Sequence, residues 1–363
     1  MNHSELIDIF RRKVGREQDR RTPDLYAPLR VNGLYDESPR PPRRVPSESV
    51  ETILELQWRE RQFKGVIEAV GRATPRSIRQ TVGRLREWDA PSDLAADPVV
   101  LVPYLSDGIV RELEQAALSG IDLNGNYLLL SSELVAIRGD QPNDYPQSRD
   151  IKKVYSKNSS IVGRFMLRES RRYKQVKEIY EEIQKLGGGV SLSTVSKVLK
   201  SLDEDLLISK KRGEIRLLQP AKLLARLRDG YQKPQVGRTL RLRLPDSRRV
   251  ELLNEVLRTR WVWTGETSAS RYATTTPPTS WVAYTASGAE MEKLTEFEDR
   301  RFYNCVLKTC DDPFVYFDSR EDDQGNWASP VETYLALSQL DKRERELALS
   351  IREKVVLVEF EDV

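Results

Sequence analysis

The chain has 363 residues, of which 39% are hydrophobic and 32% charged, a composition typical of a globular protein long enough for two or three domains. No apolar run approaches the ~20 residues that a membrane-spanning helix needs, and the polar N-terminal residues contain no signal-peptide core, so we expect a cytoplasmic protein without membrane contact. The net charge of +3 is unevenly distributed: residues 151–250 carry +15, residues 251–363 carry −9 and residues 1–150 carry −3. Charge sorted in this way indicates nucleic-acid binding.

Histidine and cysteine are too scarce for most catalytic and metal sites. His3 is the only histidine, which excludes a Ser–His–Asp triad, a histidine-rich metal site and the zinc-protease motif. Cys305 and Cys310 have four residues between them and no histidine nearby, so we interpret them as two unpaired thiols. No GxxxxGK[ST] sequence occurs, and the glycines at 187–189 follow a predicted helix, which indicates a helix-ending turn. We therefore predict no cofactor and no bound metal.

The first 150 residues are predicted to form a terminal segment and an α/β domain. Residues 1–50 hold one amphipathic helix, at 4–15, followed by a Pro-, Arg- and Ser-rich stretch at 33–49 that predicts an extended linker. In residues 51–150 the sequence predicts both strands and helices. The expected strands lie at 51–56, 63–70, 98–102, 127–130 and 134–137, and the expected helices at 75–88 and 106–119. Residues 138–159 are predicted to be a polar connector.

The acidic residues on the first two of these strands raise the possibility of a restriction-endonuclease-like domain. Such nucleases hold Mg²⁺ with carboxylates on neighbouring strands and orient the attacking water with a lysine two positions after one of them. Glu55 and Glu68 occupy the acidic positions, but Val70 stands where the lysine belongs. We therefore predict an inactive endonuclease-like domain; an ordinary α/β domain with surface glutamates fits the pattern equally well.

Residues 151–220 have the element order of a winged helix-turn-helix. Three helices are predicted at 160–167, 175–186 and 191–202, followed by strands at 206–209 and 214–218. The third helix carries apolar residues at 192, 195, 198, 199 and 202, which is the spacing of a buried stripe. In a helix-turn-helix, the face of this helix opposite the stripe enters the DNA major groove.

The predicted DNA contacts are the polar and basic residues outside this stripe. On the third helix they are Ser191, Ser193, Thr194, Ser196, Lys197 and Lys200. At the tip of the hairpin they are Lys210, Lys211 and Arg212, and ahead of the second helix Arg171 and Arg172 are placed to hold the phosphate backbone. The alternative is a protein-interaction module whose lysines form a solvated face.

Residues 221–363 are predicted to form an α+β domain. The expected helices lie at 221–228, 250–258, 330–338 and 342–355, and the expected strands at 239–244, 281–285, 302–307 and 314–317. Three tryptophans, Trp261, Trp263 and Trp281, either line a partner surface or pack in the core, and core packing is expected for at least two of them.

Three segments of the chain resemble the AbiEi-type transcriptional regulators, the antitoxins of type IV toxin–antitoxin systems. One is SGIDLNGN at residues 119–126, and another is SLSTVSKVLKSLDEDLLISKKRGEIRLLQP at residues 191–220. The third combines TGE at residues 264–266, continuing to Ala273, with ASPVETYL at residues 328–335. Together these segments extend over about residues 51–355.

The resemblance implies a sequence-specific regulator that binds double-stranded operator DNA, represses its own operon and acts beside a nucleotidyltransferase-like toxin encoded nearby. DNA readers of this kind are by default homodimers on inverted repeats. Two alternatives remain open at this point. One is a Mg²⁺-dependent nuclease that uses Glu55 and Glu68, and the other is a non-catalytic adaptor in a defence system.

Overall fold

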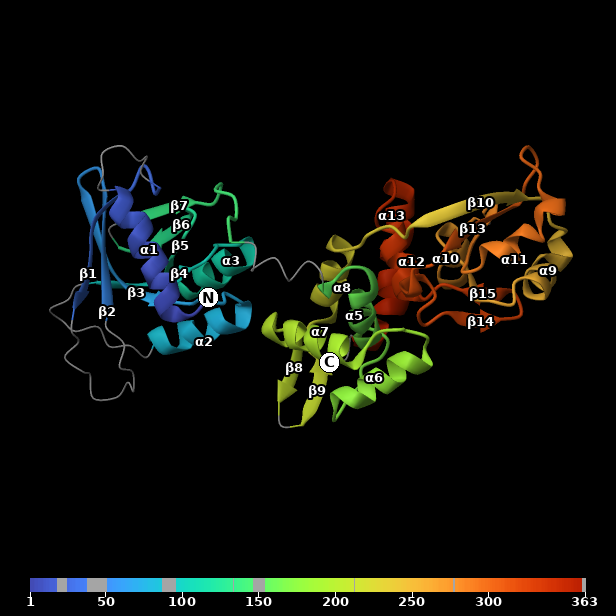
Figure 1. The fold of residues 1–363 in the computed structure, drawn as a ribbon, viewed down its shortest axis with the longest axis horizontal. Coiled ribbons are helices and arrows are strands. Elements are labelled where there is room, and N and C mark those ends of the chain that lie inside the picture. The colour runs from blue at the N-terminus through green and yellow to red at the C-terminus, as the bar shows by residue number, and fades with distance from the viewer. Residues whose placement is uncertain are drawn as a thin grey trace. The chain divides into compact units, whose positions relative to one another are not determined.

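The computed structural model describes residues 1–17, 25–37, 51–86, 96–132, 134–145, 154–211, 213–276 and 278–360, and the chain folds into two compact units, Met1–Asp150 and Ile151–Val363 (Figure 1). Both units contain helices and sheets, which confirms the mixed α/β, multidomain class. Within the described residues, no helix combines the length and the apolar character needed to cross a membrane.

The first unit is built around a seven-stranded sheet whose strands lie in chain order. These are β1 (Arg30–Glu37), β2 (Glu51–Trp58), β3 (Arg61–Ala69), β4 (Asp97–Val102), β5 (Ser119–Asp122), β6 (Tyr127–Leu130) and β7 (Val135–Arg138). Neighbouring strands are antiparallel except β3–β4 and β4–β5. These two parallel pairs are connected by α2 (Pro75–Arg86) and α3 (Asp107–Ala116), because a parallel pair requires a crossover that returns the chain to the same end of the sheet.

Alternating side chains of the central strands bury both faces of this sheet. Val99 and Leu101 of β4 belong to the cluster that includes α1 (His3–Glu17), whereas Val100 and Val102 belong to the cluster that includes α2 and α3. A strand buried on both faces reads as a continuous apolar run, which is why the sequence DPVVLV predicts it well.

The N-terminal residues are part of this unit rather than a separate segment. Leu6 and Phe10 of α1 are fully buried in the core of the sheet, so a domain that begins at residue 51 would lack one of its own layers. The linker predicted at 33–49 is wrong for its first five residues, which lie in β1 and pair with β2. Residues 38–49 lie outside the described residues. The helix predicted at 106–119 ends at Ala116, because Ala117 is left-handed (φ +53°) and the chain then enters β5.

The turn after β5 is held by a buried carboxylate. Asp122 is fully buried and accepts hydrogen bonds from the backbone nitrogens of Leu105 (2.9 Å), Asn124 (2.7 Å) and Asn126 (2.9 Å). The side-chain amide of Asn126 donates a fourth, at 2.7 Å. Gly125 has a φ of +94°, and a Cβ there would lie 2.3 Å from the Leu25 carbonyl oxygen. The sequence DLNGN is thus explained by the geometry of this turn.

The second unit begins with three helices and a hairpin. The helices are α5 (Ser160–Met166), α6 (Val176–Lys185) and α7 (Leu192–Glu204), and the hairpin is formed by β8 (Ile208–Lys211) and β9 (Glu214–Leu217). Tyr173, ahead of α6, forms an isolated antiparallel bridge with Ile215 of β9, which attaches the hairpin to the helices. The helix α8 (Pro220–Asp229) follows directly.

The remainder of this unit is a six-stranded mixed sheet with helices around it. Its strands lie in the order β10 (Val236–Leu242), β13 (Cys305–Cys310), β12 (Trp281–Thr285), β11 (Trp261–Trp263), β15 (Gly325–Trp327) and β14 (Arg320–Asp322). The helices are α9 (Arg249–Val256), α10 (Glu266–Tyr272), α11 (Gly288–Glu292), α12 (Pro330–Leu337) and α13 (Lys342–Ile351). Trp261 and Trp263 are buried and Trp281 is half-buried, which confirms core packing for two of the three.

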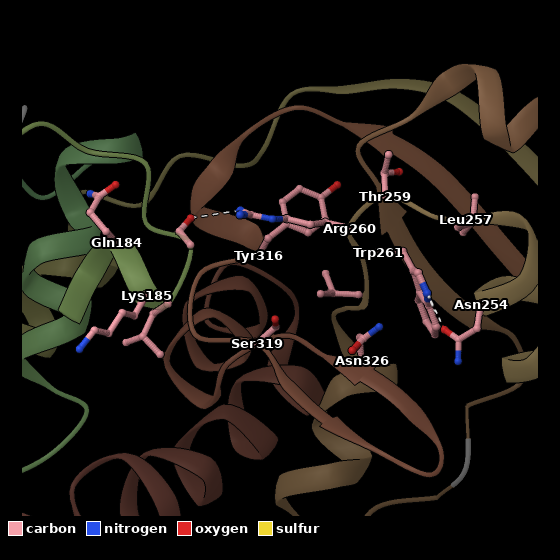
Figure 2. Close-up of a pocket in the computed structure, with 13 residues that line it drawn as sticks. Gln184, Lys185, Asn254, Leu257, Thr259, Arg260, Trp261, Tyr316, Ser319 and Asn326 are labelled. Atoms are coloured by element: carbon pink, nitrogen blue, oxygen red, sulfur yellow. Dashed lines mark hydrogen bonds between the residues drawn. The ribbon is translucent and has the colours of Figure 1, made fainter. Parts of the chain in front are cut away.

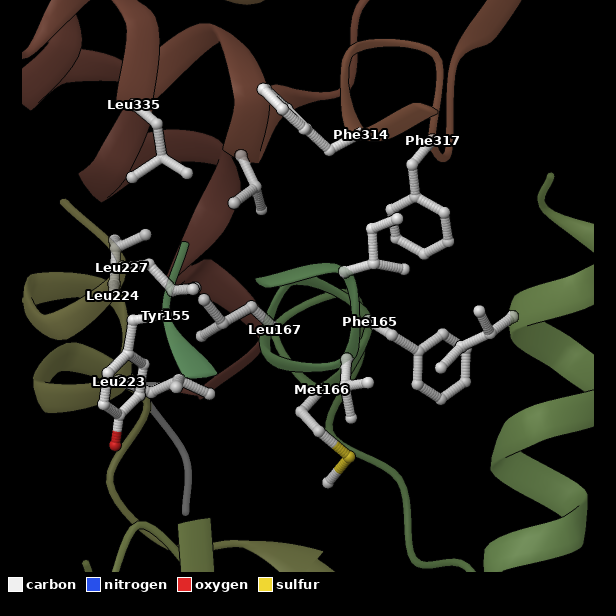
Figure 3. Close-up of a cluster of buried hydrophobic side chains, with 14 of the residues drawn as sticks. Tyr155, Phe165, Met166, Leu167, Leu223, Leu224, Leu227, Phe314, Phe317 and Leu335 are labelled. Carbon is white, nitrogen blue, oxygen red and sulfur yellow. The ribbon is translucent and has the colours of Figure 1, made fainter. Parts of the chain in front are cut away.

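The boundary predicted between residues 220 and 221 does not separate two cores. One hydrophobic cluster contains Phe165 of α5, Leu227 of α8, Leu335 of α12 and the side chain of Phe314 (Figure 3). Because these side chains share one core, residues 151–220 and residues 221–363 form a single compact unit. The sequence does not reveal this shared core, since the amphipathic pattern of each segment is compatible with a separate domain.

The strand predictions of this unit are displaced or wrong in several places: the strand expected at 206–209 is observed at Ile208–Lys211 and the one expected at 239–244 at Val236–Leu242. The strand expected at 314–317 is wrong, because Pro313–Val315 form a 3₁₀ turn with proline at its start. Phe314 in this turn and Phe317 just after it are both buried. The strand expected at 302–307 is observed at Cys305–Cys310, because Phe302 is 70% exposed and the paired, buried residues begin at Cys305.

Candidate nucleic-acid interface

The N-terminus of α7 is fixed by a cap and by the glycines before it. Ser191 is the N-cap residue, and its Oγ accepts a hydrogen bond from the backbone nitrogen of Thr194 at 3.2 Å. Gly187 and Gly189 have φ values of +78° and +59°, so the chain makes a left-handed turn after α6. The prediction that these glycines end a helix is therefore confirmed.

The apolar stripe of α7 is buried and determines which face is presented outward. Val195, Val198, Leu199 and Leu202 have exposures of 0–3%. Leu192 departs from the predicted stripe, since it lies in the first turn and is 44% exposed. On the opposite side Ser193, Ser196, Lys197 and Lys200 are all exposed. Spacings of three and four residues place them on one helix face about two turns long.

The other predicted hydroxyls at this end of α7 lie within hydrogen-bonding distance of one another. Thr194 is half-buried, and Ser191 Oγ lies 2.9 Å from Ser193 Oγ and 2.9 Å from Thr194 Oγ1. A capping oxygen has less capacity for another partner. Ser193 and Ser196 are therefore better placed than Ser191 to contact a ligand.

The C-terminal end of α7 is anchored by a buried tyrosine–aspartate contact. Asp205 follows the helix, and the Tyr155 hydroxyl donates a hydrogen bond to its carboxylate. Burial raises the pKa of Asp205, although the bond from Tyr155 and the nearby Arg226 act in the opposite direction. The backbone nitrogen of Lys210 donates to Asp203 Oδ1 at 3.3 Å, which ties the hairpin to the same helix end.

The hairpin presents two exposed lysines close to its tip. In its register Lys211 lies opposite Glu214 and Lys210 lies opposite the buried Ile215. Gly213 has a φ of +74°, a conformation that favours glycine in a tight turn. Lys210 and Lys211 are exposed, as predicted, and Arg212 lies outside the described residues.

Arg171 and Arg172 are both bound by carboxylates of the same unit. Arg171 lies 2.7 Å from Glu182 and 3.2 Å from Glu178, and Glu182 is the main cause of its raised pKa. Arg172 lies 3.4 Å from Glu214. Their predicted contact with a phosphate backbone stays a prediction, and it would require these ion pairs to exchange partners.

The four lysines of α7 and the hairpin differ from these arginines. In the part of the chain that the structure describes, no carboxylate lies within ion-pair distance of Lys197, Lys200, Lys210 or Lys211. Sequence reasoning missed one further exposed cation, Arg216 of β9, which lies 3.7 Å from Glu214. The alternation of β9 could have identified it, because the buried Ile215 directs its neighbours outward.

The two acidic residues of the nuclease alternative are not brought together. Glu55 lies opposite Lys64 in the β2–β3 register, and Glu68 is four residues further along β3, about 13 Å away at ~3.3 Å per residue. Glu55 accepts a hydrogen bond from the Tyr35 hydroxyl (2.7 Å), and Glu68 lies 2.8 Å from Arg84. Within the described residues, no group of three potential metal ligands occurs.

Among the described residues, the predicted site residues of the second unit therefore lie on α7, at its N-cap and on the adjoining hairpin, apart from Arg171 and Arg172, whose charges are engaged. The arrangement combines small hydroxyls with lysines that have no acidic partner among the described residues. Compared with protein-family models, with curated proteins and with solved structures, the chain gives no match.

Proposed function

We propose that this protein is a sequence-specific DNA-binding transcriptional regulator and that residues 151–220 act as its winged helix-turn-helix. The observation that carries the proposal is the exposed face of α7, where Ser193, Ser196, Lys197 and Lys200 lie together and the lysines lack acidic partners among the described residues. The basic hairpin, with Lys210 and Lys211, adjoins the same helix.

In this proposal α7 enters the major groove and the hairpin contacts a neighbouring groove or phosphate track. Ser193 and Ser196 are short enough to let the helix approach base edges, while Lys197 and Lys200 neutralise phosphates. The Tyr155–Asp205 contact and the Ser191 cap hold the two ends of α7, so the reading helix is positioned before it meets DNA.

The biological context of the proposal comes from the sequence resemblance alone. By that resemblance we propose an antitoxin-type autorepressor in the cytoplasm that binds its own operator as a homodimer, beside a nucleotidyltransferase-like toxin. The alternative of a non-catalytic adaptor would use the same exposed lysines as a solvated face. DNA affinity distinguishes the two.

The test is fluorescence anisotropy on DNA from immediately upstream of the gene, compared with a scrambled duplex at two salt concentrations. We expect tighter binding to the upstream DNA, with the preference retained at the higher salt. The variant Lys197→Ala/Lys200→Ala should bind more weakly, with a log–log salt slope lower by about 0.9 for each phosphate that a lysine no longer neutralises.

A matched control removes the same charge elsewhere in the unit. Lys342→Ala/Lys354→Ala changes two exposed lysines of the C-terminal helices and should leave both the affinity and the salt slope as in the unmodified protein. Equal effects of the two double variants, or equal affinity for the two duplexes, would refute the proposal and favour the adaptor.

For the first unit we propose a scaffold without nuclease activity. Support comes from Val70 in place of a catalytic lysine and from the separation and the cationic or hydroxyl partners of Glu55 and Glu68. Supercoiled plasmid incubated with the protein and Mg²⁺ or Mn²⁺ should remain intact. Nicking that disappears in Glu68→Ala would overturn this.

A further inference from the structure

A polar pocket in the second unit lies where the end of α6 meets the start of β11. Its cavity volume is about 360 Å³, within the range of small-molecule sites, and Lys185, Gly187, Asn254, Arg260, Trp261 and Asn326 are among its lining residues (Figure 2). Neither the DNA-reading face nor the interior of the sheet uses this pocket.

The charge of the lining is positive. Lys185 and Arg260 both line the pocket, whereas no Asp or Glu does. Within the described residues neither cation has a carboxylate at ion-pair distance. Two unpaired cations at one cavity favour an anion, and a phosphomonoester with a charge near −2 at neutral pH matches them.

Two carbonyl oxygens of the lining, those of Leu186 and Gly187 just after α6, accept hydrogen bonds. Arg260 Nη1 donates to the Gly187 oxygen at 3.2 Å, and the Asp318 nitrogen donates to the Leu186 oxygen at 3.4 Å. The first of these bonds holds the Arg260 guanidinium against the glycine turn.

The remaining wall supplies amide and hydroxyl groups. Asn254 Oδ1 accepts a hydrogen bond from the Trp261 indole nitrogen at 3.0 Å, which fixes the orientation of this amide. Among the described residues the amide nitrogens of Asn254 and Asn326 donate to no protein atom. Ser319 adds a hydroxyl to the lining, whereas the Thr259 hydroxyl already donates a hydrogen bond to Glu290 at 2.7 Å. Such groups suit a polar, hydroxyl-bearing ligand better than an aromatic one.

We propose that this pocket binds a small phosphate-bearing molecule, with Arg260 holding the phosphate and the asparagine amides contacting its polar remainder. Figure 2 shows the Lys185 ammonium directed away from Arg260, so Lys185 would join the phosphate by rotating its side chain. Binding would compete for the guanidinium that now holds Gly187, which lies in the turn leading into α7. Occupancy would therefore change how firmly the N-terminus of α7 is held. This coupling to DNA affinity rests on the proposed function; the binding itself does not.

Binding is tested by isothermal titration calorimetry of the full chain with ribose 5-phosphate, inorganic phosphate and ribose. We expect ribose 5-phosphate to bind and ribose not to bind. If inorganic phosphate binds with comparable affinity, the site is one for the free anion. If inorganic phosphate does not bind, the site is one for an organic phosphate. Arg260→Gln should weaken binding about tenfold or more, the effect of losing a charge-assisted hydrogen bond. Absence of binding by both phosphates would overturn the proposal.

The matched control is Arg258→Gln, which removes an exposed cation two residues away that does not line the pocket. It should bind as the unmodified protein does, and an equal loss in both variants would overturn the site assignment. A far-UV circular dichroism spectrum and melting temperature equal to those of the unmodified protein show that Arg260→Gln is folded. Asn326→Ala provides a second variant of the same site without a charge change.

The coupling is tested by repeating the DNA anisotropy measurement with and without ribose 5-phosphate. A shift in DNA affinity that is absent in Arg260→Gln supports it. Calorimetric binding together with an unchanged DNA affinity would overturn the coupling. Calorimetric binding by a protein that binds no DNA would leave the pocket established and refute the proposed function instead, so the two failures are distinguishable.

Discussion

Arg164 and Glu332, 168 positions apart in the chain, form a fully buried ion pair with 2.5 Å between Nη1 and Oε2. Arg164 lies on α5 and Glu332 on α12, so the pair connects the helices at the start of the second unit with the helices around its six-stranded sheet. The Tyr231 hydroxyl donates to the other carboxylate oxygen at 3.0 Å. Burial raises the pKa of Glu332, and the attraction and hydrogen bond of Arg164 oppose that shift.

Removing one partner of this pair should destabilise the second unit strongly. Arg164→Leu leaves a buried carboxylate without its cation, and we expect a loss of about 3–5 kcal/mol in the free energy of unfolding. Arg164→Leu/Glu332→Leu removes both charges and should recover much of that loss. Urea unfolding of the single and double variants measures the coupling. A double variant as unstable as the sum of the singles would contradict this account.

An exposed pair of the same unit serves as the control. Lys342 and Glu346 on α13 lie 3.9 Å apart and are 88% and 65% exposed. Solvent screens such pairs, so their double-mutant cycle should show little coupling.

The pH dependence of stability should reveal a second carboxyl, Glu266 at the start of α10. Its pKa is raised, first by burial and then by the neighbouring Glu344, with Arg343 acting against the shift. A carboxyl whose pKa is raised in the folded state stabilises the fold at a pH below its unfolded-state pKa, which is 4.5. This contribution to stability is lost as the pH rises through the folded-state pKa. At pH 7 the two carboxylates repel each other.

Glu266→Gln should therefore be more stable than the unmodified protein at pH 7, by about 1–2 °C in melting temperature, and should lose this advantage near pH 4.5. Melting curves from pH 4 to pH 8 test this. Glu346→Gln, on the same helix as Glu344 but paired with Lys342, is the control and should not show the same pH-dependent gain. Parallel curves for Glu266→Gln and the unmodified protein would contradict the repulsion.

The first unit should depend on Asp122 more than on any surface acid. Asp122→Ala removes four hydrogen bonds and leaves buried backbone donors unsatisfied, so we expect a loss of more than about 3 kcal/mol in the unfolding free energy. Asp140→Ala changes an exposed acid of the same unit and should have little effect. Urea unfolding followed by circular dichroism provides the comparison; similar midpoints for the two variants would show that the turn is not held by this carboxylate.

Elements with a strong periodic pattern could be predicted from the sequence, and elements defined by distant partners could not. The helix α7 and the strand β4 can be predicted from local sequence. Burial of one helix face gives apolar residues at spacings of three and four, and burial of both sheet faces gives a continuous apolar run. The strand β1 is not predictable in this way, because its pairing with β2 is not visible in the polar sequence RVNGLYDE. The apolar residues from Phe314 to Phe317 predict a strand, although Phe314 is buried from a 3₁₀ turn and Phe317 from the turn that follows it.

In the candidate site, too, features that depend on distant residues could not be predicted from the sequence. Exposure of Lys197 and Lys200 follows from the helix pattern, and the structure agrees. The ion pairs of Arg171 with Glu178 and Glu182 require the segment before α6 to fold back along that helix, which no local pattern specifies. The pocket at Arg260 depends on residues from four separate parts of the chain, so only the three-dimensional structure reveals it.

The partners of each cation predict unequal contributions to DNA binding. Lys210→Ala/Lys211→Ala should weaken binding and lower the salt slope by up to about 1.8, because both lysines lack acidic partners among the described residues and can each neutralise a phosphate. Arg171→Gln should leave the slope unchanged, because the guanidinium at 2.7 Å from Glu182 is already neutralised and releases no counterion from DNA. Fluorescence anisotropy over a salt series measures both slopes, with circular dichroism to confirm that each variant is folded. A drop in slope for Arg171→Gln as large as that expected for one lysine would show that its ion pairs exchange for phosphate on binding. The prediction that the unpaired hairpin lysines contribute more to the salt slope than the paired arginine would then be wrong.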